Sequence, residues 1–295
     1  MSPRDERECA GRAGHRSFSG FLRSLLVGVP WSERAQTVET LELAAPPGGV
    51  FRVHNSNGRT DIKGEDRSDI LVTASKCARA ESTAAAEEML GGIRLAFAET
   101  PDGLDLDVEV PRKWNRRGSA NLCIRLPREM TVWVAAANGR VSVDGIHGQV
   151  RARSTNGSAT VSNVVGNVEV ATTNAKVSCS CICGRLTARS SNGKIEIGDH
   201  RGSVDASTSN GLIRASFEGL GKGGAQLATS NGRIVLDLPE EVDADVDVRV
   251  DNGVIRNDRT LQHTTRQSNG RIVGRLGHGG ALVKLRTSNG SISLR

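Results

Sequence analysis

Apolar and polar residues alternate along most of this chain, and the alternation restarts at regular intervals. Around Asn156, for example, Val150 and Ala152 precede the asparagine by six and four residues, and Ala159 follows it by three. The positions between these apolar residues hold mostly Arg, Lys, Ser, Thr, Asp and Glu. An alternation of period two predicts strands with one apolar and one solvated face, and it excludes helices from this region.

The alternation belongs to a repeat marked by an asparagine, and glycine follows this asparagine in nine of ten copies. Between Asn138 and Asn210 the copies are 18 residues apart, and the later intervals are 21, 21, 17 and 20 residues. A constant interval of this length indicates one small structural unit copied along the chain. Besides Asn57, the series comprises the residues that we expect to form a structural ladder: Asn138, Asn156, Asn174, Asn192, Asn210, Asn231, Asn252, Asn269 and Asn289.

Two all-β folds satisfy this pattern. In a parallel β-solenoid of 18–21-residue coils, each asparagine points inward at a corner, and its amide bonds to the asparagines of the adjacent coils. In an antiparallel β-hairpin meander, each Asn-Gly pair forms a type I′ turn. We favour the solenoid because Ala175 follows Asn174, and a type I′ turn tolerates alanine badly at that position. A second glycine series marks a second corner ten residues after the asparagine, at Gly148, Gly166, Gly184 and Gly202.

The chain divides into three parts by composition. We expect residues 1–35 to be a disordered or weakly amphipathic N-terminal segment. Residues 36–137 predict a β-rich cap with a helical insertion at about residues 81–98, and residues 138–295 hold the Asn-Gly repeats. The apolar run at residues 21–30 is too short to span a bilayer and lacks the features of a signal peptide. This observation favours a cytoplasmic location without a transmembrane segment.

The region around Asn57 resembles a known family. The residues that carry the resemblance read VHNSNGRTDI at positions 53–62 and DILVTASK at positions 69–76. They are similar to the opening of the bacterial putative-adhesin family of β-strand repeats, a domain of unknown function, and the similarity covers about residues 37–295. The resemblance implies a β-helical fold, a role in the cell envelope or in stress sensing, and no catalytic residues.

Positive charge gathers in the repeats. The chain has a net charge of +6, and residues 138–295 hold 20 Lys and Arg against 14 Asp and Glu. Basic residues recur two positions after and three positions before the asparagine, so a solenoid would align them in stripes parallel to its axis. The candidate polyanion-binding residues are Arg140, Arg153, Lys176, Arg189, Lys194, Arg233, Arg249, Arg266, Arg271 and Arg286.

These stripes have two interpretations. They predict a surface for an anionic polymer such as a polysaccharide, a phosphate-rich polymer or lipid headgroups. The alternative is a solvated face that keeps the protein soluble, since Glu169, Asp205 and Asp247 interleave with the basic residues. Aromatic residues make up only 3% of the chain, which argues against base stacking and sequence-specific nucleic-acid binding.

The cysteines offer the one candidate metal or redox site. Cys179, Cys181 and Cys183 alternate within one copy of the repeat. We interpret them as structural thiols, because the nearest histidines, His147 and His200, fall at different places in their own coils. No metal ligand and no cofactor are therefore predicted.

Enzymatic activity is not predicted either. Asp144, Glu196 and Asp199 are the candidate acids of a carbohydrate-active enzyme, but the corners between Asn138 and Asn231 are too short to build the walls of a catalytic groove. The sequence therefore favours a non-enzymatic interaction or scaffold protein with a protein or anionic-polymer partner. Polyanion or envelope-polymer binding is the first alternative and a carbohydrate-active enzyme the second. End-to-end self-association stays open, because residues 286–294 have no evident cap.

Overall fold

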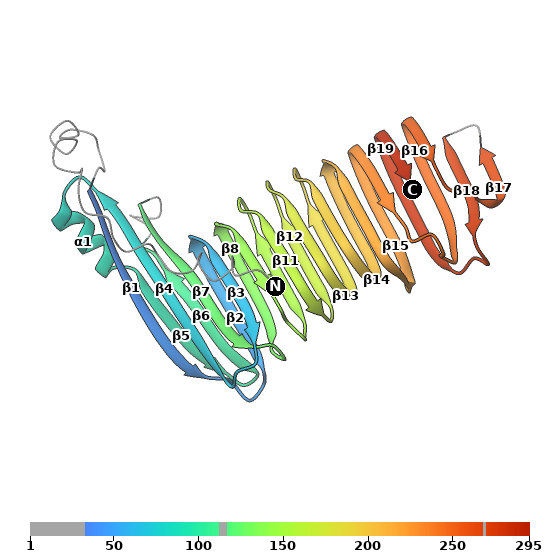
Figure 1. The fold of residues 1–295 in the computed structure, drawn as a ribbon. Coiled ribbons are helices and arrows are strands. Elements are labelled where there is room, and N and C mark those ends of the chain that lie inside the picture. Colours follow the sequence, from blue (N-terminus) through green and yellow to red (C-terminus); the bar gives the residue numbers. More distant parts are fainter. Residues whose placement is uncertain (1–32, 112–116, 268–269) are drawn as a thin grey trace, which may run out of the picture.

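The computed structural model describes residues 33–111, 117–267 and 270–295. These residues form an elongated stack of strands, with one short helix at the end near the N-terminal strands (Figure 1). The fold is all-β. Asn269, the apolar run at residues 21–30 and most of the predicted N-terminal segment lie outside the described residues.

Seven strands precede the repeats, and the helix α1 (Thr83–Gly91) lies between the fourth and the fifth of them in the sequence. They are β1 (Glu33–Ala44), β2 (Val50–Asn57), β3 (Thr60–Glu65), β4 (Asp69–Ala80), β5 (Arg94–Thr100), β6 (Gly103–Glu109) and β7 (Gly118–Pro127). The strands of the repeats are β8 (Thr131–Asn138), β9 (Val141–Asp144), β10 (Val150–Ser154), β11 (Ala159–Val165), β12 (Val168–Thr172), β13 (Val177–Ser190), β14 (Ile195–Asn210), β15 (Ile213–Asp237), β16 (Ala244–Asn257), β17 (Gln262–Gln267), β18 (Arg271–Leu276) and β19 (Ala281–Leu294).

Successive copies of the repeat pair with one another in parallel. The parallel pairs form two columns of strands. The first column contains β8, β10 and β12, where Val150 pairs with Val132 and Val168. The second contains β9, β11 and the start of β13, where Ala159 pairs with Val141 and Val177. Pairing therefore joins residues one copy apart and not the two sides of an Asn-Gly pair. The hairpin alternative is wrong for these copies, and Ala175 is not among the described residues with positive φ.

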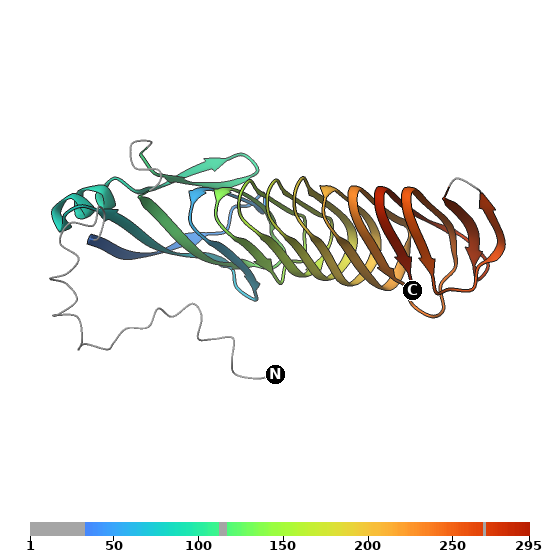
Figure 2. The same cartoon turned by 90° about the horizontal axis from the view of Figure 1, so that it is seen from above.

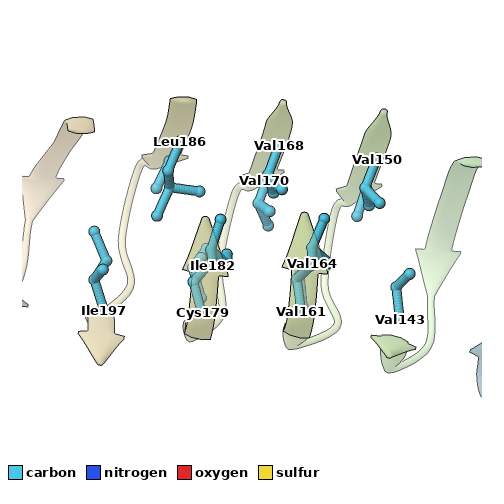
Figure 3. Close-up of a cluster of buried hydrophobic side chains, with 14 of the residues drawn as sticks. Val143, Val150, Val161, Val164, Val168, Val170, Cys179, Ile182, Leu186 and Ile197 are labelled. Carbon is cyan, nitrogen blue, oxygen red and sulfur yellow. The ribbon is translucent and has the colours of Figure 1, made fainter. Parts of the chain in front are cut away.

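The core lies between the two columns. Side chains of the first column, such as Val150 and Val168, point toward those of the second, such as Val161 and Ile182 (Figure 3). Valine, isoleucine, leucine and alanine fill this layer because the two columns contribute one inward residue at every second position. The outward residues of the first column form its outer face.

The order of strands in space departs from their order in the chain at both ends of the stack. Near the start, β2 lies between β6 and β8, and β3 lies between β7 and β9. Near the end, β19 pairs in parallel with β15 on one side and with β16 on the other. The strand that follows β15 in the chain is therefore separated from it in space by residues 281–294.

The ends of the stack correct three expectations. The helix is shorter than residues 81–98, because it ends at Gly91 and residues 94–100 pair with β6 as an antiparallel strand. Residues 36–137 are more than a cap, since β2, β3, β6 and β7 extend the two parallel columns. Residues 286–294 are not exposed at the end, because β16, β18 and β17 cover that side as an antiparallel unit (Figure 2).

Among the described residues, no helix has the length and apolar character needed to cross a membrane.

Candidate functional site

The repeat asparagines form a continuous row of side-chain hydrogen bonds at one corner. Asn156 Nδ2 donates to Asn138 Oδ1 over 2.9 Å, and Asn174 Nδ2 donates to Asn156 Oδ1 over 3.0 Å. The same bond recurs through Asn192, Asn210, Asn231, Asn289 and Asn252, in that spatial order. These side chains are exposed, so the expected inward orientation is wrong.

The buried polar group at this corner is instead the hydroxyl two residues before the asparagine. Thr172 Oγ1 donates to the carbonyl oxygen of Gly157 over 3.1 Å, and Thr208 Oγ1 donates to that of Gly193 over 3.1 Å. Each hydroxyl thus reaches the residue that follows the asparagine of the preceding coil. This bond satisfies a carbonyl that the corner buries, which explains why the position holds Ser or Thr within an otherwise apolar series.

The candidate basic residues are largely paired with carboxylates. Arg153 Nη2 lies 2.7 Å from Glu169 Oε1, and Arg189 Nη2 lies 2.6 Å from Asp205 Oδ2. The structure describes the side chains of nine candidates, and seven of them form such ion pairs. Besides Arg153 and Arg189, the paired candidates are Lys176, Lys194, Arg249, Arg271 and Arg286. Arg140 and Arg233 have no ion pair within the described residues, and the side chain of Arg266 lies outside them.

The two predicted stripes lie on different surfaces. The basic residues at the position three before the asparagine share the outer face of the first column: Arg153, Arg189, Arg249 and Arg286. The basic residues at the position two after the asparagine lie past the corner, at or near the start of the second-column segments: Arg140, Lys176, Lys194 and Arg233. Arg271 belongs to neither row, because β18 runs antiparallel to β16 and places it opposite Arg249.

A hollow on the outer face of the first column centres on Trp133. We call it the Trp133 groove, and its volume is about 340 Å³. Strands β6, β2, β8 and β10 lie side by side beneath it. Its outward side chains are Asp105, Asp107, Arg52, His54, Trp133, Ala135, Arg151 and Arg153.

Two guanidinium groups lie over the Trp133 ring. The Cζ atoms of Arg52 and Arg151 are 4.5 Å and 5.3 Å from the ring centroid. Because β2 and β10 flank β8 on opposite sides, the two arginines approach from either side. Each such contact contributes about 0.5–1 kcal/mol at an exposed site. The ring is therefore held in a fixed position on the sheet.

Carboxylates hold the two arginines in turn. Arg52 lies 2.7 Å from Asp102 and 3.0 Å from Asp105, and its hydrogen bond to Asp105 is the largest cause of its raised pKa. Glu169 accepts hydrogen bonds from Arg151 Nε over 2.9 Å and from Arg153 Nη2 over 2.7 Å. The hydrogen bond from Arg153 lowers the pKa of Glu169 most, so this carboxylate stays ionised and fixes both guanidinium groups.

A second hollow, of about 220 Å³, adjoins the groove and shares Trp133 and Arg151 with it. It reaches across β10 and β12 to Arg185 and Thr187. The two hollows meet at the tryptophan, so the outer face offers a continuous depression over several strands. A depression of this kind suits an extended ligand better than a compact one.

Sequence reasoning missed Trp133. The residue stands five positions before Asn138, where the neighbouring copies carry Arg151 and Glu169. That position is outward by parity, and one aromatic residue in an outward series was the available signal. The predicted basic residues include only Arg153 from the groove, because Arg52 belongs to a strand that lies far away in the sequence.

Other candidate chemistry is dispersed. Cys179 is buried, and burial raises the pKa of its thiol to about 12, whereas Cys181 and Cys183 are exposed at a corner. His200 is buried in the core, and His147 Nδ1 lies 3.3 Å from Glu129 Oε1 at the surface. Within the described ranges, no group of three His, Cys, Asp or Glu side chains is placed to hold a metal ion.

Comparison with known families decides the affiliation of this fold. A family model described as Toastrack DUF4097 matches residues 52–295, which is most of the chain. The chain belongs to the Toastrack DUF4097 family. The resemblance to β-strand repeats of the adhesin type is thereby confirmed. No curated relative matches this Toastrack chain.

Solved structures similar to the Toastrack chain share little sequence with it. A "putative adhesin" from Bacteroides fragilis has 10% identity and a TM-score of 0.47, over 88% of this chain and 97% of its own. A "putative lipid binding protein" from Parabacteroides distasonis has 12% identity and a TM-score of 0.41, over 88% and 97%. A "putative cell adhesion protein" from Clostridium sporogenes has 9% identity and a TM-score of 0.29, over 88% and 99%. Likenesses at this level carry no inference about function.

Proposed function

We propose that this Toastrack protein is a non-enzymatic binding protein that holds an anionic polymer against the outer face of its first strand column. The observation that carries the proposal is the Trp133 groove, where guanidinium groups from β2 and β10 converge on one aromatic ring. We also propose that the repeats form a parallel β-solenoid. Each coil then extends the same outer face by about 4.8 Å, giving a long and rigid surface.

The distribution of charge supports a linear ligand. Arg153 and Arg189 are two coils apart in the same outward row, so about 10 Å separates their backbones along the stack. An ion pair with a carboxylate occupies only part of a guanidinium group, which has five N–H donors. The remaining donors face solvent and suit an anionic ligand. Because carboxylates interleave with the arginines, we expect a moderate affinity that salt weakens.

The carboxyl groups near the groove support binding over catalysis. Hydrogen bonds from arginine lower the pKa of both Asp102 and Glu169. A glycosidase needs a carboxylic acid that keeps its proton, and hence a raised pKa. Of the three candidate acids, Glu196 has a pKa lowered by its hydrogen bonds from Lys176 and Lys194. Ionised carboxylates of this kind orient arginine and lysine side chains and do not donate protons.

Heparin chromatography tests the proposal. We expect the protein to be retained at low ionic strength and the double variant Arg151→Gln/Arg153→Gln to elute at clearly lower salt. The matched control is Arg201→Gln/Arg214→Gln, which removes the same charge at the second corner and in the second column, away from the outer face of the first column. The control should elute close to the original protein. Failure of the protein to bind at low salt, or equal shifts for both pairs, would overturn the proposal.

A further inference from the structure

The Trp133 groove changes character along the stack. One end, at β6, presents the carboxylates of Asp105 and Asp107, and the other end, at β10, presents Arg151 and Arg153. Trp133 lies between them. Strands β6 and β10 are three strand spacings apart, or about 14 Å. A ligand lying along the stack therefore meets hydrogen-bond acceptors, an aromatic ring and hydrogen-bond donors in turn.

The floor of the groove opens at Ala135. In the same outward row, His54 on β2 flanks it on one side and Arg153 on β10 on the other. Both flanking side chains are long and exposed, so the methyl group between them leaves a gap. Trp133, two residues earlier on the same face of β8, forms the wall of this gap. The volume of the whole Trp133 groove, about 340 Å³, lies in the range of sites for small ligands or single units of a polymer.

The basic end has fixed and unused donors. Glu169 accepts hydrogen bonds from Nε of Arg151 and from Nη2 of Arg153, and Nη2 of Arg151 lies 2.9 Å from its Oε2. No contact in the described part of the chain uses Nη1 of Arg151 or Nη1 and Nε of Arg153. These groups are held in place before any ligand arrives. A carboxylate is the natural acceptor for a pair of oriented guanidinium groups.

We infer that the Trp133 groove binds a carboxylate-bearing sugar unit of an acidic polysaccharide, an inference that rests on the proposed function. The carboxylate lies against Arg151 and Arg153, the ring fills the gap over Ala135 beside Trp133, and hydroxyls donate to Asp105 and Asp107. Oδ1 of Asp105 faces Arg52 and Oδ1 of Asp107 faces His54. A polyphosphate has no hydroxyls to donate to the two Oδ2 atoms, and it brings negative charge against them. A neutral sugar leaves the arginine donors unused. Only an acidic sugar complements both ends.

Titration calorimetry on the full chain tests this selectivity. The probes are oligogalacturonate, the same oligomer with its carboxyl groups methyl-esterified, and polyphosphate of similar length. We expect oligogalacturonate to bind at least about tenfold more tightly than its ester, because a charge-assisted pair is replaced by neutral contacts. Equal affinity for the acid and the ester, or a preference for polyphosphate, would overturn the inference.

A pair of alanine substitutions locates the site. Ala135→Phe fills the gap and leaves every charge in place, so we expect loss of oligogalacturonate binding by at least about tenfold. Ala171→Phe is the matched control, because Ala171 occupies the same outward row next to Arg153 but does not line either hollow. It should bind as the original protein does. Equal behaviour of the two variants, each shown to be folded by circular dichroism, would show that the gap is not the site.

Binding of variants to heparin and to oligogalacturonate distinguishes the sugar site from general polymer binding. We expect the double variant Arg151→Gln/Arg153→Gln to bind the acid and the ester with similar affinity, since both selecting guanidinium groups are gone. Retention of Ala135→Phe on heparin together with unchanged oligogalacturonate binding would leave polymer binding standing and refute the sugar site. Binding of neither heparin nor any oligomer by the original protein would refute both.

Discussion

His200 is the residue most at odds with its surroundings. It occupies the core position that Ile146, Val164 and Ile182 hold in the preceding coils, and it is fully buried. Neither ring nitrogen has a hydrogen-bond partner within the described residues. Its only aromatic neighbour there is Phe217, whose ring centroid lies 5.4 Å away in an edge-to-face arrangement. Burial lowers the pKa of His200 from 6.5 to about 4.

This pKa predicts a loss of stability in acid that His200→Leu should remove. Below pH 6.5 the unfolded chain takes up a proton at this residue, while the folded chain does so only near pH 4. The free energy of unfolding therefore falls as the pH drops from 6.5 to about 4, by about 3 kcal/mol in total. Urea unfolding at pH 7 and pH 4.5 measures this. The gain from His200→Leu should grow toward acid, whereas exposed His54→Gln should change little. Parallel pH profiles would contradict the prediction.

The corner hydroxyls predict a second effect at single residues. Thr172→Val keeps the shape of the side chain but leaves the carbonyl of Gly157 without its hydrogen bond. We expect a loss of about 1–3 kcal/mol, the cost of a buried polar group without a partner. Thr173→Val is the control, because Thr173 is exposed. Denaturant unfolding compares the two. Similar stabilities would mean that the corner hydroxyl contributes nothing.

At the scale of the repeat element, the glycine after the asparagine sets how closely coils approach. A Cβ atom at Gly193 would collide with the carbonyl oxygen of Ala175 in the preceding coil. We expect Gly193→Ala to destabilise the protein by about 1–3 kcal/mol through this overpacking. Gly198→Ala is the control in the adjoining strand β14, since a Cβ there meets no atom within 4 Å. A melting temperature lowered equally in both variants would speak against close packing as the cause.

The repeat itself could be predicted from the sequence, but the direction of its asparagine could not. If inward and outward residues alternated strictly, Asn156 would point inward like Ala152 and Ser154. The parity fails because the chain turns at the corner, and Ser154 is the last residue that points inward. The groove was missed for a different reason. Its aromatic residue, Trp133, gains its meaning from Arg52, which the fold brings alongside from a distant strand.

At the scale of the whole molecule, the order of coils could not be predicted either. Val283 and Leu285 of β19 repeat the pattern of Val246 and Val248 in β16, so either strand satisfies the same position in the stack. What distinguishes them is the antiparallel pairing of β18 with β16, which leaves β16 only one edge for a parallel partner. The choice is made by contacts across the end of the stack, and no local pattern records it.

Hydrogen exchange tests this insertion of β19. Its backbone pairs on both edges, with β15 and β16, whereas β17 pairs within the described residues only with β18 and has an irregular register. An amide exchanges more slowly when opening its hydrogen bond costs more free energy, so a strand paired on both edges is protected more strongly. We expect β19 amides to exchange as slowly as those of β13 and about 100-fold more slowly than those of β17. Because β19 follows β17 in the chain, a stack built in chain order would place β19 at the exposed end and reverse this difference.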